Sequence, residues 1–264
     1  MLSTVAPVTQ PVPAPPPGVA PIERVRVAYL RRHETDYVFS FWTALGWTLL
    51  TCGIYALYVI YQLLRRDREH NRRRLELLEA TNELAWRRAL EAGLAEELRP
   101  NFERVGEHLR VLRQMTTDFR EPWVWVVLAV VGGGIVNLVA YVLLDQDLVR
   151  HDYHEGGAEH ELAHILGRLG TPVPAPDPAR LKRPHAYVAR VVVTVLTLGL
   201  YGLWWTYNVM VEGNRHFAAN WAWEDGLAAA LAPGATGAPP DGPPATPGTA
   251  TPPAPPVGGP PTGP

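Results

Sequence analysis

The sequence predicts an all-α membrane protein with about three transmembrane helices, a charged helical hairpin between the first two spans, and disordered Pro-rich termini. The main observation is three apolar segments, at 38–64, 122–144 and 187–210, which together hold one charged residue, Arg190. A hydrocarbon core about 30 Å thick needs about 20 helical residues, so each segment is long enough to cross it. Three such runs in a short chain disfavour buried helices of a soluble protein. We therefore expect a multi-pass protein of the cell membrane.

Both ends of the chain have low-complexity sequences. Residues 1–22 are mostly Pro, Ala and Val, and residues 232–264 are almost entirely Ala, Pro, Gly and Thr. Such segments cannot bury enough apolar surface to offset the entropy of ordering the chain, so we expect both to be disordered. The N-terminus has no basic stretch followed by an apolar run, so no cleaved signal peptide is expected.

Charge and cysteine content narrow the classes of function. The formal net charge is −2, which gives no basic excess for nucleic acid. The single cysteine, Cys52, excludes an intramolecular disulfide and a cysteine-based zinc ribbon. Arginines gather beside the apolar segments, most densely at 65–74. This pattern is typical of topology determinants that contact anionic lipid, so the expected partner is a lipid bilayer, with the 65–74 cluster on the cytoplasmic side.

The first and third apolar segments repeat each other. The sequence LLTCGIYALY at 49–58 aligns without gaps with VLTLGLYGLW at 195–204. The order Thr-x-Gly-x-Tyr-x-Leu-aromatic is unlikely to occur twice by chance. Its glycines weaken a helix and its threonines can bond back to the preceding turn, which permits a bend. We expect one tilted span over 38–64. The alternative is a re-entrant hairpin, which the arginines on both sides of this segment favour.

These two segments resemble the membrane proteins grouped as domain of unknown function 4234. The signature of that family is an apolar run ending in Thr-x-Gly-hydrophobic-Tyr-Gly-hydrophobic-aromatic. The resemblance covers only the two repeats, within 23–64 and 185–231. It departs from the pattern at Ala56, where Gly is usual, and a basic stretch follows only the first copy. The resemblance implies a membrane protein and carries over no catalytic residue, because the family has no established activity.

The charged segment 65–121 predicts a helical hairpin. One apolar stripe at spacings of four and three comprises Leu98, Phe102, Val105, Leu109 and Leu112. A weaker stripe upstream comprises Leu75, Leu78, Ala85, Ala89 and Ala92. Pro100 suits the first turn of the second helix. We expect the two stripes to pack on each other. The alternative is a coiled-coil surface at 70–118 for a homo-oligomer or a protein partner.

The segment 145–170 is the one that could carry chemistry. His160, Glu161 and His164 form a His-Glu-x-x-His match. On a helix, two histidines at this spacing can ligate one zinc ion, and the glutamate can act as general base on the bound water. A catalytic zinc needs a third protein ligand, which Glu212 or His216 could supply. This interpretation predicts a zinc-dependent membrane metalloprotease.

The simpler interpretation of 145–170 is an amphipathic helix that lies along the membrane. Its apolar face would comprise Leu148, Leu162, Ile165, Leu166 and Leu169. The segment is crowded with His and Glu, so a chance motif match is common, and the Pro-rich linker 171–184 offers no ligand at the usual near spacing. We therefore expect no catalytic residue, metal ligand or cofactor, and a non-enzymatic interaction or membrane-organising role. The zinc protease remains the alternative.

Overall fold

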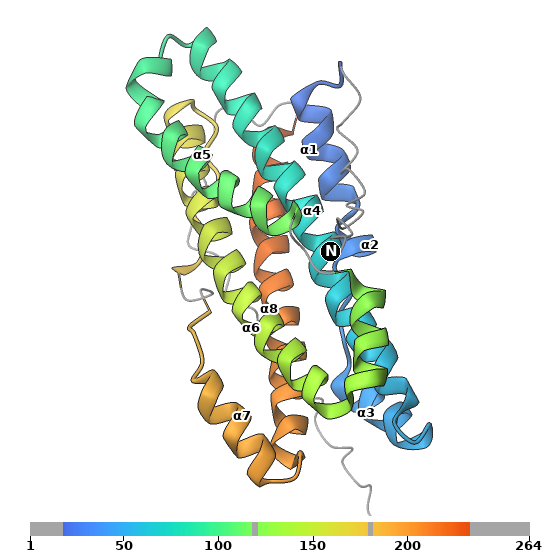
Figure 1. The fold of residues 1–264 in the computed structure, drawn as a ribbon. Helices are drawn as coiled ribbons and strands as arrows, with labels where there is room; N and C mark the ends of the chain where they lie inside the picture. Colours follow the sequence, from blue (N-terminus) through green and yellow to red (C-terminus); the bar gives the residue numbers. More distant parts are fainter. Residues whose placement is uncertain (1–17, 118–120, 179–181, 233–264) are drawn as a thin grey trace, which may run out of the picture.

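The computed structural model describes residues 18–117, 121–178 and 182–232, and within these ranges the regular secondary structure is helical (Figure 1). The all-α prediction is confirmed. The helices are α1 (Pro21–Leu30), α2 (Arg32–Thr35), α3 (Phe41–Leu50), α4 (Ile54–Glu91), α5 (Ala95–Thr117), α6 (Pro122–Arg168), α7 (Tyr187–Leu196) and α8 (Leu200–Leu231). The disorder predicted for 1–22 and 232–264 falls mostly on residues outside the described ranges, but α1 begins at Pro21.

The long helices α4, α6 and α8 run through two separate cores. The upper core in Figure 1 joins the stripe of α4 to the stripe of α5, and for example Leu78 and Leu109 lie in the same cluster. Leu162 and Ile165 of α6 lie in that cluster too. The predicted interfacial helix at 145–170 is therefore wrong, because the apolar face of this segment is buried inside the bundle. The α5 helix begins before Pro100, which lies inside it.

The lower core in Figure 1 belongs to the apolar segments. It gathers buried side chains of α3, α4, α6 and α8 around Trp205, which is fully buried. The helices of these segments do not run straight through. Gly53 and Gly199 adopt left-handed backbone angles, at φ 93° and 92°, and separate α3 from α4 and α7 from α8. Within α6, Gly133 has φ 56° and ψ −139°, which interrupts the helix in the middle of its apolar part.

The two repeats make the same turn with the same hydrogen bonds. Thr51 Oγ1 donates to the carbonyl of Trp47 at 2.8 Å and accepts from the backbone N–H of Tyr55 at 2.9 Å. In the second copy Thr197 makes the equivalent bonds at 2.8 and 3.0 Å. One hydroxyl thus closes the first helix and caps the second. The residue before each glycine, Cys52 or Leu198, also has a positive φ of 49°. The two helices that flank each of these turns lie side by side, so the chain reverses direction there (Figure 1).

The ends of each apolar segment return to one polar layer, which we call the polar collar. In the first segment, Arg66 at one end donates to the carbonyl of Tyr37 at the other, at 3.5 Å. Arg66 also donates to the carbonyl of Val209 at 3.1 Å, which ties the third segment to the same layer. The collar comprises Arg66, Arg68, Glu121, Asp145, Lys182, His185, Arg190 and Glu212.

Both ends of the second segment and of the third also lie in the polar collar. Glu121, before the second segment, pairs with Arg68 at 2.7 Å. Asp147 follows the other end of the second segment and lies near Asp67, which follows the first segment. Burial is the larger cause that raises the pKa of Asp67 to about 6, and the charge of Asp147 raises it further. Lys182, before the third segment, pairs with Glu212 after it at 2.7 Å. All three apolar segments are therefore helical hairpins whose tips lie together at the lower end of Figure 1.

This arrangement corrects the predicted spans. The single tilted helix expected over 38–64 is wrong, because the segment turns back at Cys52 and Gly53. The helix expected over 187–210 is interrupted in the same way. By length and composition, one helix among the described residues, α6, could cross a membrane. Its apolar part, however, contains the break at Gly133.

Candidate functional site

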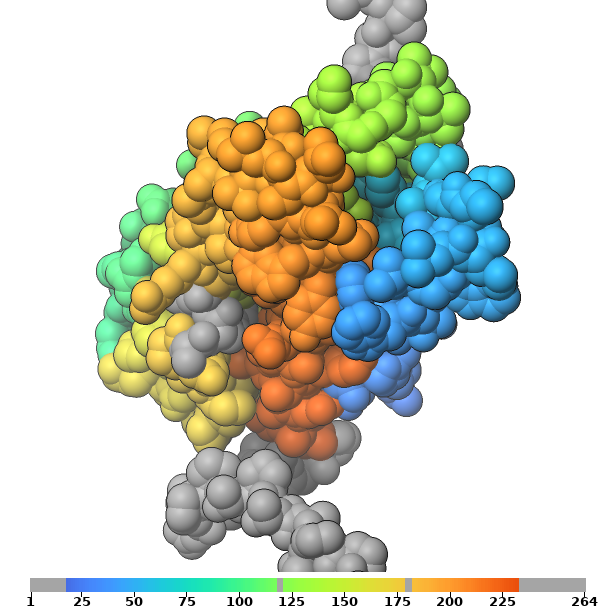
Figure 2. Space-filling model, turned by 90° about the horizontal axis from the view of Figure 1, so that it is seen from below, coloured from blue at the N-terminus to red at the C-terminus, as the bar shows by residue number. Residues whose placement is uncertain are grey.

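The hairpin tips form an exposed apolar surface. At the first tip Leu50 is 72% exposed, at the second Val131 is 83% exposed, and at the third Leu198 is 95% exposed. Figure 2 looks onto this end of the molecule, where the blue, bright green and orange hairpins make up the face. The apolar tip surface comprises Trp47, Leu49, Leu50, Ile54, Val130, Val131, Ile135, Val195, Leu196, Leu198 and Leu200. Exposed apolar patches of this kind mark an interaction site.

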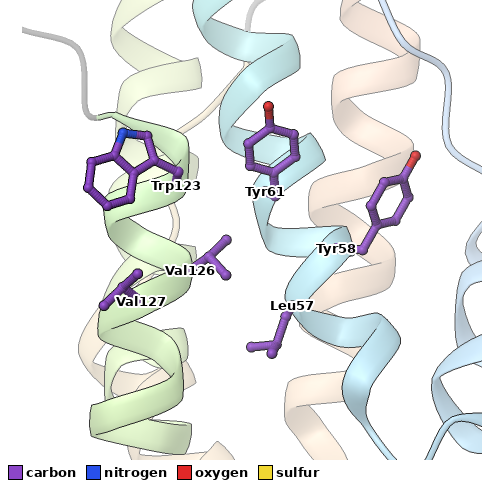
Figure 3. Close-up of a pocket in the computed structure, with 6 residues that line it drawn as sticks. All are labelled: Leu57, Tyr58, Tyr61, Trp123, Val126 and Val127. Atoms are coloured by element: carbon purple, nitrogen blue, oxygen red, sulfur yellow. The ribbon is translucent and has the colours of Figure 1, made fainter.

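A groove of about 320 Å³ opens between the first and second hairpins (Figure 3). Its walls are Leu57, Tyr58 and Tyr61 of α4 and Trp123, Val126 and Val127 of α6. The Tyr58 hydroxyl accepts a hydrogen bond from Gln62 at 2.9 Å. The groove therefore has apolar walls with aromatic residues at its upper end, next to the polar collar.

The polar collar is held by ion pairs around Asp145. This buried carboxylate contacts Lys182, lies 2.9 Å from Nδ1 of His185 and lies 3.4 Å from Arg190. Asp145, His185 and Glu212 have the atoms and spacing of a metal site. Two cationic side chains already face Asp145, however, so this group is better described as an ion-pair cluster.

The His-Glu-x-x-His residues lie elsewhere on the molecule. His160 and His164 are exposed on α6. Glu161 accepts hydrogen bonds from Arg104 at 2.7 Å and from Asn101 at 2.8 Å. Partial burial works against ionisation, but these bonds lower the pKa of Glu161, so it is held as a paired carboxylate. Neither metal-type group found within the described residues includes His160 or His164.

The proposed third ligands also lie in other groups. Glu212 belongs to the collar, and His216 lies in a buried cluster with His70, His151 and Glu155. The structure thus does not gather the residues on which the zinc-protease interpretation depends. That interpretation remains a sequence-based prediction.

The buried cluster is formed by three helices where they leave the collar. His70 lies on α4, one turn beyond Arg66. His151 and Glu155 lie one turn apart on α6, and His216 lies on α8, one turn beyond Glu212. All four side chains are buried, and one ligand atom from each lies within 4.8 Å of the others. We call this group the histidine cluster.

Carboxylates orient two of its imidazoles. Nδ1 of His70 lies 2.9 Å from Asp36, and Nδ1 of His216 lies 3.0 Å from Asp152. Asp36 also accepts from Arg73 and from the indole N–H of Trp221, each at 2.7 Å. Burial opposes the charge on Asp36, but the hydrogen bond from His70 and the charge of Arg73 outweigh it and lower its pKa. Burial also lowers the pKa of His70 to about 3, which keeps this imidazole neutral.

Arg74 supports the cluster from the side of the bundle. Its fully buried guanidinium contacts Glu155 and Glu159 of α6 and lies 2.8 Å from Glu224 of α8. Burial disfavours the charge on both partners. The carboxylates nevertheless raise the pKa of Arg74. In turn, Arg74 and His151 lower the pKa of Glu155. The Arg74 contacts leave Oε2 of Glu155 directed toward the histidines.

Sequence reasoning missed the histidine cluster although a signal was present. Each of the three helices carries buried polar residues every four positions, on one face. These rows are Arg66, His70 and Arg74; His151, Glu155 and Glu159; and His216, Asn220 and Glu224. Each row lies on a helix that extends beyond an apolar hairpin. Polar residues at helical spacing on three such helices indicate that the helices share a buried polar core.

Comparisons with protein-family models, with curated proteins and with solved structures found no match for this chain. The resemblance of the two Thr-x-Gly-x-Tyr segments to domain of unknown function 4234 stays a prediction from the sequence.

Proposed function

We propose that this protein is anchored in one leaflet of a membrane by its three apolar hairpins and holds its helical bundle at the membrane surface. Its role would be non-enzymatic membrane organisation or interaction. The observation that carries this proposal is that each apolar segment begins and ends at the same polar collar.

The dimensions of the hairpins support insertion in one leaflet. The ten residues of α3 and the ten of α7 each give an arm about 15 Å long. This is about half of a hydrocarbon core about 30 Å thick. The hairpins can therefore bury their tips without reaching the opposite face. A multi-pass arrangement would require the charged collar to lie on both sides of the bilayer.

The chemistry of the layers also fits a lipid surface. From the tip upward, the side chains change from aliphatic to aromatic and then to charged. Tyr58, Tyr61 and Trp123 mark the middle layer, as expected where the headgroups begin. The groove between them has the shape and polarity for an acyl chain. Arg215, exposed near the collar, adds positive charge that favours anionic headgroups. A protein partner at 70–118 would meet the polar outer faces of α4 and α5, since their apolar stripes are buried.

The native Cys52 allows a direct test of insertion, because it is the single cysteine of the chain and lies exposed at the first tip. We would attach a nitroxide to Cys52 and insert the protein into vesicles of phosphatidylcholine and phosphatidylglycerol. We expect strong collisions with oxygen and weak collisions with a water-soluble nickel chelate. A nitroxide at Arg87→Cys in a Cys52→Ser background is the control. It should show the opposite pattern, because Arg87 is exposed near the far end of α4. Free access of the nickel chelate to Cys52 would rule out insertion of this tip.

A further inference from the structure

We propose that His70, His151, Glu155 and His216 bind one divalent first-row transition-metal ion, with zinc as the probe. This site is separate from the apolar tip surface and does not depend on membrane insertion. It is also separate from the His160–His164 motif. Three imidazoles and one carboxylate are a ligand set that zinc and iron both accept.

The spacing of the ligand atoms fits a single ion. Nε2 of His70 and Nε2 of His216 are 3.2 Å apart. Oε2 of Glu155 lies 3.3 Å from Nε2 of His216 and 3.6 Å from Nε2 of His151. Four ligands at about 2.0–2.1 Å from a tetrahedral zinc ion lie about 3.3 Å from one another. Three of the six distances between the ligand atoms are therefore close to the edges of a zinc tetrahedron, and all four ligand atoms lie within 4.8 Å of one another.

The tautomers of two histidines point their lone pairs at the same place. Oδ2 of Asp36 accepts from Arg73 and Trp221, so Asp36 serves as an acceptor and His70 must donate from Nδ1. Asp152 accepts from the backbone N–H of Lys182 at 2.7 Å and from Nδ1 of His216 in the same way. With both protons on Nδ1, the two Nε2 atoms face each other as acceptors. Two facing lone pairs repel unless a cation or a hydrogen-bond donor lies between them.

His151 adds the second independent observation. Its side chain is 4% exposed, and neither ring nitrogen has a hydrogen-bond partner within 3.5 Å among the described residues, although Oε2 of Glu155 lies 3.6 Å from Nε2. A buried imidazole normally satisfies at least one nitrogen, because an unpaired buried polar group costs free energy. A metal ion bound in the cluster would be coordinated by Nε2 of His151, the ring nitrogen that faces Glu155.

Asn220 does not satisfy the site on its own. Its amide nitrogen lies 2.9 Å from Glu155, 3.1 Å from Nε2 of His216 and 3.4 Å from Nε2 of His70. An amide has two N–H hydrogens, so it can serve two of these three acceptors. The carboxylates on His70 and His216 form the outer shell that is common around metal-binding histidines, where they fix the tautomer and raise ligand basicity. Bundle cores are a usual place for such sites.

The test is metal analysis of the full-length protein, purified in detergent without a polyhistidine tag. The protein would be stripped with a chelator and then reloaded with zinc alone. We expect about one zinc per chain, and X-ray absorption with three imidazoles and one oxygen about 2.0–2.1 Å from the metal. The double variant His151→Ala/His216→Ala should weaken zinc binding by more than 100-fold. Asp152→Asn should weaken it by about 10- to 100-fold, as outer-shell changes do.

The matched control is the double variant His160→Ala/His164→Ala, which also removes two imidazoles but from the exposed face of α6. It should keep its zinc. Zinc lost from this control but kept by His151→Ala/His216→Ala would place the metal at the His-Glu-x-x-His motif and overturn the proposal. Failure of folded wild-type protein to bind zinc would also overturn it. If the cluster variant does not fold, the absorption spectrum of the wild type decides, because fewer than three imidazoles around the metal contradicts the site.

Discussion

Aspartate at the three hairpin tips should abolish membrane binding. We would introduce Leu50→Asp, Val131→Asp and Leu198→Asp, singly and together, at positions exposed at the tips. A charged aspartate in the hydrocarbon core costs about 2.5–3.5 kcal/mol, so each change should weaken binding to lipid vesicles by about 100-fold. The triple variant should remain in the aqueous fraction when vesicles are floated through a density gradient.

The control for this series is Leu90→Asp. Leu90 is an apolar residue 55% exposed on α4, near the end of the helix that lies far from the tips. The same chemical change there should leave flotation at the wild-type level. Circular dichroism of each variant in detergent shows whether the bundle is intact. Flotation of the folded triple variant with the vesicles would mean that the tips are not the membrane anchor.

Replacing Arg74 by methionine should strongly destabilise the bundle. Arg74 is fully buried and neutralises carboxylates of α6 and α8, namely Glu155, Glu159 and Glu224. Removing one partner of a buried ion pair leaves an uncompensated buried charge, at a cost of about 3–5 kcal/mol. We expect a clear loss of free energy of unfolding, measured by thermal or denaturant unfolding in detergent. Arg74→Lys should fall between the wild type and Arg74→Met, since it keeps the charge and loses the planar fork.

Arg87→Met tests whether the effect comes from burial. Arg87 lies on the same helix and pairs with Glu83 at 2.5 Å, but the two side chains are 58% and 40% exposed. Exposed pairs of this spacing contribute about 0.3–0.5 kcal/mol, so this change should be nearly neutral. Equal destabilisation by Arg74→Met and Arg87→Met would contradict the buried network that links α4 to α6 and α8.

The helical class and the position of the apolar segments could be predicted from the sequence, but the path of the chain through them could not. A run such as 38–64 is long enough for one tilted span and equally long enough for two short arms. The decision lies in the turn, where Cys52 and Gly53 are both left-handed. Glycine adopts left-handed angles readily, so Gly53 is visible in the sequence as a possible turn. Cys52 gives no such signal, and it lies next to Thr51, whose hydroxyl bonds to both arms.

Gly133 gives a second example. Small residues within an apolar segment usually suggest close approach of a neighbouring helix. Here the backbone of Gly133 takes an angle pair that few other residues adopt, and the chain turns back. The arginines on both sides of 38–64 were the sequence signal for hairpins. That the ends of the apolar segments lie in one polar layer follows only from contacts between residues far apart along the chain, such as that of Arg68 with Glu121.

The histidine cluster shows what local motifs miss. His160, Glu161 and His164 attract attention because they are consecutive in a known pattern, yet the histidines are exposed and the glutamate pairs with Arg104. The members of the cluster lie on helices separated by long stretches of sequence. Only the packing of α4 against α6 and α8 brings His70 within 3.2 Å of His216.

The most direct test of one-leaflet insertion compares the two ends of the second apolar segment. Single cysteines would replace the exposed Glu121 and Gln146, and Arg87 as a reference, in a Cys52→Ser background. Sealed membrane vesicles of uniform orientation would be treated with a maleimide that cannot cross the bilayer. One-leaflet insertion predicts that all three cysteines react from the same side, because both ends of the hairpin lie at the collar. Reaction of positions 121 and 146 from opposite sides would show that the segment crosses the membrane and would contradict the account.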